Sequence, residues 1–520
     1  MKTSFKFFTI LFLMLFSKIS IGQHQNIFIS DNDSPNEPSI AINPKNTNEL
    51  VAGANIDSYY YSTDAGFTWT EGTLSSSFGV WGDPVIACDT TGSFYFFHLS
   101  NPPSGNWIDR IVCQRTPSPG GVWNNGSYAG LNGTKAQDKQ WVTIDRGTNV
   151  IYMTWTEFDE YGSAFPLDSS RILFSKSADQ GQTWSNEIRI NEISGDCIDE
   201  DNTVEGAVPA LGPNGELYVS WAGPLGIMFD KSLDGGITWL GQDNFATSIP
   251  GGWDFSIPGI YRANGLPVTT CDTSGGPHHG TIYINWSDQR NGIFDTDIWL
   301  IKSTDGGNTW SLPAIVNDDA TFRHQFFTWM TIDQTNGNLW FVFYDRRSYI
   351  DNRTEVYMAR SADGGLNFEN FKVSDSPFIP SSAIFFGDYT NVTAHNNIVR
   401  PIWTRLDGSD LSVWTAIVDP TVVGVEDYEN GNSGFSLLEQ NYPNPFSNQT
   451  TFSFKLHQTE TITLSVYDFS GRCVYKPIVK EVFGYGKHIK VFNQQLAAGT
   501  YFYEIETEKG LMRRKMMVVD

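Results

Sequence analysis

The sequence predicts an all-β protein: a seven-bladed β-propeller, with six blades as the alternative, followed by a small β-sandwich. An octapeptide with an aspartate at a fixed place recurs along the chain, as in "STDGGNTW" at Ser303. A strand–turn–strand unit recurs around it with a spacing of about 45 to 70 residues, which is typical of propeller blades. Aromatic residues make up 14% of the chain and glycines number 48, which favours many short strands and turns.

The first residues, 1–22, predict an export signal. Lys2 and Lys6 flank the start of the apolar run "FFTILFLMLF" (7–16), and small residues follow in "SKISIG". The run is too short for a typical membrane span, and no other apolar stretch approaches the required length. We therefore expect no transmembrane segment and a mature protein that is soluble outside the cytoplasm.

The bulk composition excludes several classes of partner and cofactor. A formal net charge of −24 argues against nucleic acid and anionic membranes, which such a field repels. Five cysteines are too few for a disulfide scaffold, so we expect isolated thiols. The acidic loop 195–206 has carboxylates for calcium but no EF-hand spacing, and a solvated loop is the preferred interpretation. We predict no metal and no cofactor, because neither a zinc-like spacing nor a phosphate loop is found.

Seven repeat units predict a propeller over residues 24–420. Each reads as two strands, a third strand leading into the octapeptide, and a fourth after its last aromatic residue. The units begin near Pro38, Asp83, Lys139, Gly206, Gly265, Phe326 and Gly387. The seventh unit lacks a fourth strand, and "NIFIS" (26–30) has the length and composition to supply it. We predict that these two ends pair and close the ring, which removes an exposed sheet edge.

The octapeptide is predicted to be structural rather than catalytic. Close copies begin at Ser62, Ser177, Ser232 and Ser303, and a more degenerate copy begins at Ser361. In a hairpin between third and fourth strands, the glycines permit positive φ and the Ser and Asp side chains accept backbone N–H groups. The second unit carries an eroded copy, "TPSPGGVW" (116–123), which a structural element tolerates more easily than a catalytic one. These residues resemble the Asp-box, or BNR repeat, of sialidases, and the resemblance implies a position remote from any catalytic centre.

A change of composition after Asp419 predicts a second domain. Residues 421–434 form an acidic, glycine-containing linker, and 435–520 read as a β-sandwich. The segments "YPNPF", "VYDFSGR" and "LAAGTYFYEI" closely resemble the C-terminal sorting domain of the type IX secretion system of Bacteroidetes. The resemblance implies the secretion machinery as a partner and a secreted or cell-surface location. A generic carbohydrate-binding sandwich is the alternative.

The repeat register places residues that precede first strands and follow second strands on the face opposite the octapeptides. We call these two sets of positions the before-strand column and the after-strand column. Ionisable residues gather in both, and an arginine there can donate two hydrogen bonds to the two oxygens of a sugar carboxylate. The alternative is that pairs such as Asp288 and Arg290 tie blades together. The before-strand column is Asn36, Asp83, Lys139, Glu205, His324, Asp388 and Tyr389; the other column includes Asp57, Asp288, Asp345 and Arg405, with Arg290, Arg346 and Arg347 close behind.

Two segments of this face resemble sialidases more closely. "VEGAVPALGPNGELYVSW" is similar to the segment that carries the sialidase glutamate, here Glu205, and "GDYTNVTAHNNIVRPIW" to the one that carries the tyrosine nucleophile, here Tyr389. By position, Asp57 is the candidate acid/base. The predicted substrate-binding residues are Arg290, Arg347, Arg405, Asp288, Asp345, Asp388 and His324.

The chain also departs from sialidases. "NEP" (36–38) stands in place of their Phe-Arg-Ile-Pro motif, no arginine precedes Arg110, and sialidases have six blades. Three hypotheses follow. The first is a sialidase-like exo-glycosidase acting on or binding acidic glycans, and the second is a non-catalytic glycan- or protein-binding propeller. The third is a lyase of uronate polymers, with His324, Tyr344 and Arg346 as the candidate base, acid and carboxylate-neutralising residue.

Overall fold

The computed structural model describes residues 24–420 and, toward the C-terminus, residues 438, 441–456, 459–468, 472–507 and 510–519. The chain divides into two compact units, residues 1–426 and 427–520. The predicted export signal (1–22) and the linker (421–434) lie outside the described residues.

The first unit contains seven four-stranded antiparallel sheets, the predicted blades. Blade 1 is β2 (Ser39–Ile42), β3 (Leu50–Ala54), β4 (Ser58–Ser62) and β5 (Thr70–Thr73). Blade 2 is β6 (Val85–Cys88), β7 (Phe94–Leu99), β8 (Ile111–Thr116) and β9 (Ser127–Ala129). Blade 3 is β10 (Ala136–Ile144), β11 (Ile151–Phe158), β12 (Ser170–Ser177) and β13 (Ile188–Arg189). Blade 4 is β14 (Glu205–Leu211), β15 (Leu217–Gly223), β16 (Gly226–Ser232) and β17 (Asn244–Thr247).

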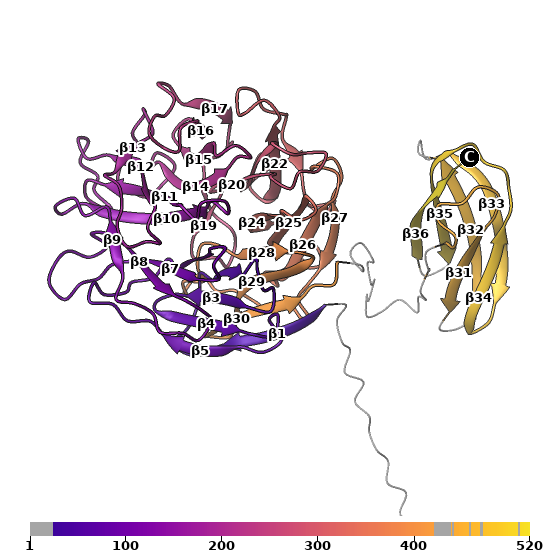
Figure 1. Ribbon diagram of the computed structural model, residues 1–520. Helices are drawn as coiled ribbons and strands as arrows, with labels where there is room; N and C mark the ends of the chain where they lie inside the picture. Colours follow the sequence, from indigo (N-terminus) through magenta and orange to yellow (C-terminus); the bar gives the residue numbers. More distant parts are fainter. Residues whose placement is uncertain are drawn as a thin grey trace, which may run out of the picture. The chain divides into compact units, whose positions relative to one another are not determined.

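The remaining blades continue the pattern. Blade 5 is β20 (Val268–Cys271), β21 (Ile282–Asp288), β22 (Asp297–Ser303) and β23 (Ala314–Ile315). Blade 6 is β24 (Gln325–Asp333), β25 (Asn338–Asp345), β26 (Glu355–Ser361) and β27 (Glu369–Lys372). Blade 7 is β28 (Asn391–His395), β29 (Ile398–Asp407), β30 (Asp410–Ile417) and β1 (Gln25–Ser30). The first strand of each blade contacts the first strand of the next, and β28 contacts β2, so the sheets form a closed ring (Figure 1). The seven-bladed prediction is confirmed.

The ring closes through strands from opposite ends of the unit. β1 pairs antiparallel with β30, and Gln25 lies opposite Ile417 and Phe28 opposite Trp414. The prediction that residues 26–30 complete the last blade is confirmed. Because the N-terminal strand of the unit, β1, pairs with its last strand, β30, neither strand is left as an open sheet edge.

A column of large side chains fills the blades at the fifth position of the second strands. Trp155, Trp221 and Trp286 are fully buried there. In blade 2 the place is held by His98, which is also fully buried; its Nδ1 bonds Leu99 O and its Nε2 bonds Gln114. Burial lowers the pKa of His98 to about 4, so the ring is neutral and acts as a core residue.

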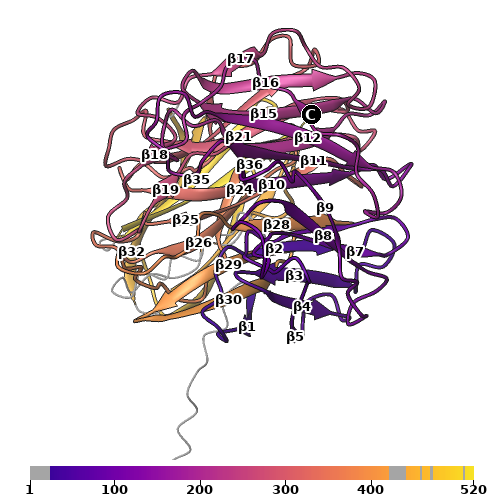
Figure 2. The ribbon, with the colours of Figure 1, turned by 90° about the vertical axis from the view of Figure 1, so that its left-hand side faces the viewer.

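One insertion interrupts the regular order. Between blades 4 and 5 the chain forms a small hairpin, β18 (Asp254–Phe255) and β19 (Ala263–Asn264). β19 lies near the middle of the ring in Figure 1, and in the edge-on view of Figure 2 the hairpin lies toward one side of it. This hairpin therefore covers the centre of one propeller face.

The second unit has two sheets that share one core. A two-stranded sheet joins β31 (Thr450–Leu456) to β34 (Gly486–Phe492). A four-stranded sheet contains β33 (Cys473–Phe483), β32 (Glu460–Asp468), β35 (Gly499–Thr507) and β36 (Gly510–Val518). Buried residues of both sheets, including Phe452 and Val466, belong to a single apolar cluster. The unit is thus the predicted small β-sandwich.

Candidate functional site

The five octapeptide hairpins (62–69, 177–184, 232–239, 303–310 and 361–368) use their polar side chains internally. In the second copy, the Thr183 N–H donates to Asp179 Oδ1 at 2.9 Å and the Thr183 hydroxyl donates to Oδ2 at 2.6 Å. The Gly181 N–H donates to Ser177 Oγ at 2.9 Å. The aspartates of the other copies, Asp64, Asp234, Asp305 and Asp363, make the corresponding bonds. Because each carboxylate is occupied by its own turn, these hairpins are structural.

The opposite face holds a group of ionisable residues around the propeller axis, all buried except the partly exposed Asp199 and Arg262. We call these nine residues the axial cluster: Glu37, Asp83, Asp138, Lys139, Asp199, Glu205, Arg262, Asp388 and Tyr389. Most stand where the chain enters the inner strand of a blade. Arg262 comes from the β18–β19 hairpin and Asp199 from the acidic loop 195–206. Segments far apart in sequence therefore meet at one centre.

Three cluster residues share an unusual backbone conformation. Glu37, Asp83 and Lys139 have φ of 51°, 49° and 50° at the entrance to blades 1, 2 and 3. A side chain other than glycine rarely adopts positive φ, because its Cβ then crowds the backbone. Three such residues at equivalent positions indicate that the ring holds them in place at a cost in local strain, as is common at functional sites.

Lys139 is the hub of the cluster. Its Nζ lies 2.8 Å from Asp388 Oδ2, 3.5 Å from Asp83 Oδ2 and 3.9 Å from Glu37 Oε1. Arg262 Nε donates to Asp388 Oδ1 at 2.8 Å, and its Nη1 donates to Asp199 Oδ2 at 3.2 Å. Both cations of the cluster are thus already paired with carboxylates.

The carboxyl groups of the cluster fall into two electrostatic classes. Burial opposes ionisation of Asp83 and Asp388, but the charge of Lys139, and for Asp388 also that of Arg262, lowers the pKa of both. Burial, reinforced by neighbouring carboxylates, raises the pKa of Glu37, Asp138 and Glu205 well above the usual range. Carboxylates held ionised therefore lie beside carboxylic acids held protonated, an arrangement that suits proton transfer.

Glu205 is the acid best placed to act on a ligand. Glu205 is 1% exposed, and among the described residues no N–H or hydroxyl donor bonds to its carboxyl oxygens; the group that interacts with them is the carboxyl group of Asp199. It lines a cavity of about 20 Å³ together with Asp199, Arg262 and Trp253. A second cavity of about 30 Å³ is also lined by Lys139 and Asp388. Each cavity has room for about one or two water molecules.

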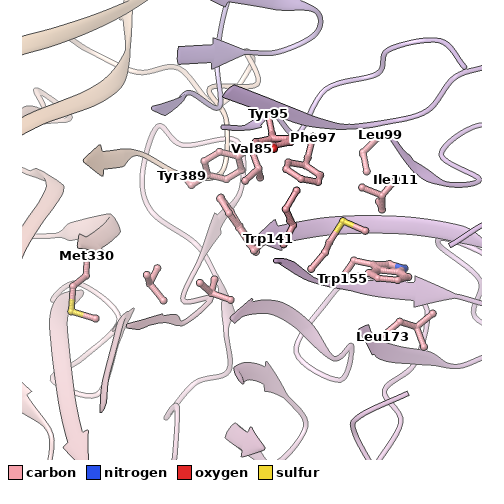
Figure 3. Close-up of a cluster of buried hydrophobic side chains, with 14 of the residues drawn as sticks. Val85, Tyr95, Phe97, Leu99, Ile111, Trp141, Trp155, Leu173, Met330 and Tyr389 are labelled. Atoms are coloured by element: carbon pink, nitrogen blue, oxygen red, sulfur yellow. The ribbon is translucent and has the colours of Figure 1, made fainter. Parts of the chain in front are cut away.

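Tyr389 lines the larger cavity. Its ring packs against Trp141 with centroids 5.2 Å apart, and Figure 3 shows both rings in the buried cluster that lies between blades. Burial and the charges of Asp83 and Glu37 raise the pKa of Tyr389 well above its usual value. No hydrogen bond joins the Tyr389 hydroxyl to a Glu205 oxygen, so the tyrosine–glutamate pair implied by the sialidase resemblance is not formed in this structure.

The three predicted substrate-binding arginines, which we call the rim arginines, each pair with a carboxylate of their own blade. Arg290 Nε donates to Asp288 Oδ1 at 2.9 Å, Arg347 Nε to Asp345 Oδ2 at 2.8 Å, and Arg405 Nε to Asp407 Oδ2 at 2.5 Å. Within residues 24–420, no hydrogen-bond or ion-pair partner is shared between any two of them. The structure does not bring them together as a clamp. The pairs with Asp288 and Asp345 form within one blade, so these pairs do not tie adjacent blades together either.

Asp57 does not line either cavity. It is partly exposed, and its carbonyl accepts the Leu74 N–H across the edge of blade 1. Burial raises its pKa, and the nearest charge that acts on it is that of Asp33. The structure therefore places the predicted acid/base away from Glu205.

The three candidate lyase residues form hydrogen bonds to neighbouring segments of the propeller. The Tyr344 hydroxyl donates to Thr404 O at 2.8 Å and accepts the Thr404 N–H at 3.0 Å, which leaves it no role toward a ligand. His324 Nδ1 pairs with the Thr296 hydroxyl, and burial, with the charge of Arg346, lowers the His324 pKa to about 4. Arg346 Nη1 donates to Pro258 O and so anchors the β18–β19 hairpin.

Six cluster residues were not predicted as site residues. Two of them, Asp83 and Lys139, stand in the before-strand column, and the other four stand outside both columns. Glu37 and Asp138 each lie one position from a residue of the before-strand column, Asn36 and Lys139. Asp199 belongs to the acidic loop that was interpreted as solvated, and Arg262 to the insertion before blade 5. The unusual length of that insertion was the signal in the sequence, but nothing in its residues shows that it folds back over the axis.

Three further findings concern the described residues as a whole. No group of three or more His, Cys, Asp or Glu side chains in the described ranges is arranged to hold a metal ion. The five cysteines, all within those ranges, are free thiols. The same ranges contain no helix of the length and hydrophobicity needed to span a bilayer.

Comparison with known proteins identifies the C-terminal unit. Residues 440–519 match the secretion system C-terminal sorting domain. The prediction of a sorting domain is confirmed, and it marks the chain for type IX secretion, to the medium or the cell surface. A search of proteins of curated function by sequence finds no match.

Solved structures share the repeated β-architecture of the first unit at low identity. They include the Hadza microbial sialidase Hz136, with 14% identity over 72% of this chain and 74% of that one, at a TM-score of 0.41. NanB sialidase from Streptococcus pneumoniae has 9% identity over 71% and 83%, at 0.42. The PL25 ulvan lyase bound to an oligosaccharide has 12% identity over 74% and 92%, at 0.42. At these values nothing about the activity of this chain is drawn from them.

Proposed function

We propose that this secreted propeller is a glycoside hydrolase that acts at the axial cluster, with Glu205 as the proton donor. One observation carries the proposal. Glu205 is a buried carboxyl group whose raised pKa favours the protonated form, no N–H or hydroxyl donor among the described residues bonds to its oxygens, and it lines a cavity beside a second carboxyl group, Asp199, with which it interacts. Two carboxyl groups in different environments are what most glycosidases use.

The reaction follows from these two groups. Glu205 gives its proton to the glycosidic oxygen as the bond to the anomeric carbon breaks, so the leaving sugar departs as an alcohol. Water adds to the anomeric carbon, and its proton returns to a carboxylate of the site. Asp199 is positioned for the second role, because its Oδ2 accepts the Tyr161 hydroxyl at 2.6 Å and Arg262 Nη1 at 3.2 Å.

The charge balance favours a neutral glycan over an acidic one. Lys139 and Arg262 are already bound to cluster carboxylates, and the rim arginines are bound to Asp288, Asp345 and Asp407. A sugar carboxylate would have to displace one of these partners and would meet the remaining carboxylates of the site. Neutral hydroxyl groups can bond to these groups without that cost.

The size of the cavities supports a second candidate function. At about 20 and 30 Å³ they have room for water rather than a sugar ring, and residues of the β18–β19 hairpin are part of the lining of both. A propeller that binds a glycan at the mouth of the cluster without cleaving it fits this closed arrangement.

The test is to incubate the secreted chain with neutral and acidic polysaccharides and to read released reducing ends and ultraviolet absorbance. Glu205→Gln is expected to lower the release of reducing ends at least about 100-fold, since a general acid contributes that much. Glu369→Gln, on the outer strand β27, is the matched control and should keep full activity. Full activity of Glu205→Gln would overturn the assignment. Binding without product would favour the second candidate, and a rise in absorbance would instead indicate a lyase.

A further inference from the structure

We infer that Trp81, Trp107 and Tyr161 form a sugar-stacking platform beside the axial cluster, a subsite that holds rings of a glycan chain next to Glu205. For the chemical class of the ligand this inference rests on the proposed function. It assigns binding, however, to Trp81 and Trp107, which take no part in the cleavage step.

The platform stands out by its exposure. The chain has 17 tryptophans, all within residues 24–420. In that range only Trp81 and Trp107 are exposed, at 39% and 44% of the residue surface. Tryptophan is rarely left in water without a ligand or partner, because its large apolar surface gains most from burial. Two exposed tryptophans side by side are therefore a specific signal.

The three rings form a continuous row. Trp81 and Trp107 meet edge to face with centroids 6.0 Å apart, and Trp107 meets Tyr161 in the same way at 5.6 Å. Tyr161 is supported from below by the buried Phe158, 5.1 Å away. The rings come from the chain entering blade 2, from a loop of blade 2 and from a loop of blade 3. Each ring fixes the next, so little side-chain freedom is lost when a ligand binds.

Both ends of the row adjoin the axial cluster. Trp81 lies two residues before Asp83, which contacts Lys139. At the other end the Tyr161 hydroxyl donates to Asp199 Oδ2 at 2.6 Å. Asp199 and Glu205 line the same cavity, which places the Tyr161 hydroxyl close to the proposed proton donor. A chain lying on the rings would thus reach the cavity that Glu205 lines.

The chemistry of the surface matches a sugar polymer. Pyranose rings present apolar C–H faces that pack on aromatic rings, and their hydroxyl edges need hydrogen-bond partners such as the carboxyl groups of the cluster. Apolar walls with a few convergent polar groups are the usual composition of a small-ligand site. The surface of three aromatic rings is small compared with the roughly 800 Å² that each partner buries in a stable protein interface. The narrow row with a polar cavity beside it favours a glycan chain over a protein.

The test measures binding and cleavage separately on the full secreted chain. Soluble hexasaccharides of glucose, xylose and mannose are titrated while tryptophan fluorescence is followed. At least one is expected to bind and to change the emission of Trp81 and Trp107. Trp107→Ala is expected to weaken that binding at least about 10-fold, which corresponds to about 1.4 kcal/mol. Phe245→Ala, an equally exposed aromatic on outer strand β17, is the matched control and should bind normally.

The outcomes separate the platform from the hydrolase. Glu205→Gln should bind as tightly as the wild type and release no product, whereas Trp107→Ala should raise KM with little change in kcat. If Trp107→Ala and Trp81→Ala bind like the wild type while Glu205→Gln is inactive, the platform is wrong and the hydrolase stands. If the tryptophan variants lose binding but no glycan is cleaved, the platform stands and the hydrolase is wrong. Absence of binding to every hexasaccharide by the wild type would overturn the platform.

Discussion

The two faces of the propeller hold carboxyl groups in opposite electrostatic states. In the octapeptide hairpins the aspartate is near solvent, and a hydrogen bond from the Thr183 hydroxyl, with others, lowers the pKa of Asp179 to about 2. In the axial cluster, burial first and neighbouring carboxylates second raise the pKa of Glu37, Asp138 and Glu205. The hairpin carboxylates have every bond satisfied within eight residues. The cluster carboxyls depend on neighbours from other blades, and no N–H or hydroxyl donor among the described residues bonds to the oxygens of Glu205.

This difference separates structure from function. A group whose partners lie in its own turn is stabilised wherever that turn forms, so it can be repeated blade after blade without change. A group whose state depends on several blades exists only once, at the axis, and its pKa can be tuned there. Repetition therefore marks the structural aspartates, and a shared axial position marks the candidates for chemistry.

The largest expected effect is a loss of stability on removal of the Lys139 charge. Lys139→Met leaves Asp83 without its ion-pair partner and Asp388 with Arg262 alone. Breaking a buried ion pair in this way costs about 3–5 kcal/mol, so the free energy of unfolding should fall by that amount in a urea titration. Lys176→Met is the control, since Lys176 bonds only a carbonyl, Gly235 O, near the surface. Equal effects of the two variants would show that the cluster is not an electrostatic unit.

The pH dependence of stability should differ between the two faces. The raised pKa of Glu205 means that its contribution to stability is complete below the usual carboxyl pKa and is lost as pH rises toward the raised value. The lowered pKa of Asp179 gives the reverse: its contribution is complete above about 4 and is lost as pH falls toward 2. Glu205→Gln should therefore flatten the alkaline limb of melting temperature against pH. An alkaline limb identical to that of the wild type would contradict a buried, protonated Glu205.

A smaller effect is expected from one octapeptide. Asp179→Ala removes the acceptor for the Thr183 N–H and hydroxyl groups, which remain open to water, so the free energy of unfolding should fall by about 1 kcal/mol. Glycan cleavage or binding should be unchanged, because the hairpin lies on the other face. A loss of activity without a loss of stability would return the octapeptides to the list of candidate sites. Asp179→Asn, which keeps part of the acceptor, should lie between the two.

The smallest expected effect is a gain in thermal stability. The degenerate copy in blade 2 has Ser118 where the others have aspartate, and it has Val122 where four of the others have threonine and the copy at Ser361 has Asn367. The double variant Ser118→Asp and Val122→Thr restores the pattern and should raise the melting temperature by a few degrees at most, since each new hydrogen bond adds about 0.5–1.5 kcal/mol. A large loss of stability would show that the hairpin of blade 2 has a different backbone requirement. Thermal unfolding followed by circular dichroism is sufficient for this comparison.

Much of the fold was predictable because its signals are local. Strand alternation, turn glycines and the octapeptide gave seven blades, and the missing fourth strand of the last blade indicated closure by residues 26–30. The burial of His98 agrees with its place in the tryptophan column of the second strands. The candidate site was only partly predictable: the column that contains Asp83, Lys139 and Asp388 does meet at the axis. Arg405 stands in the after-strand column, with Arg290 and Arg347 close behind that column, but each of the three is bound within its own blade.

The sequence by itself determined the repeat, the number of blades, the closing strand, the structural nature of the octapeptides and the secretion domain. Each of these rests on residues a few positions apart or on a segment that matches as a whole. Only the tertiary structure decided which charged groups are paired. It also decided that Arg262 and Asp199 reach the axis, that Glu205 has no N–H or hydroxyl donor among the described residues, and that two exposed tryptophans lie together beside it. These facts depend on distances between side chains of different blades, and in the low-polarity interior such distances fix both charge state and function.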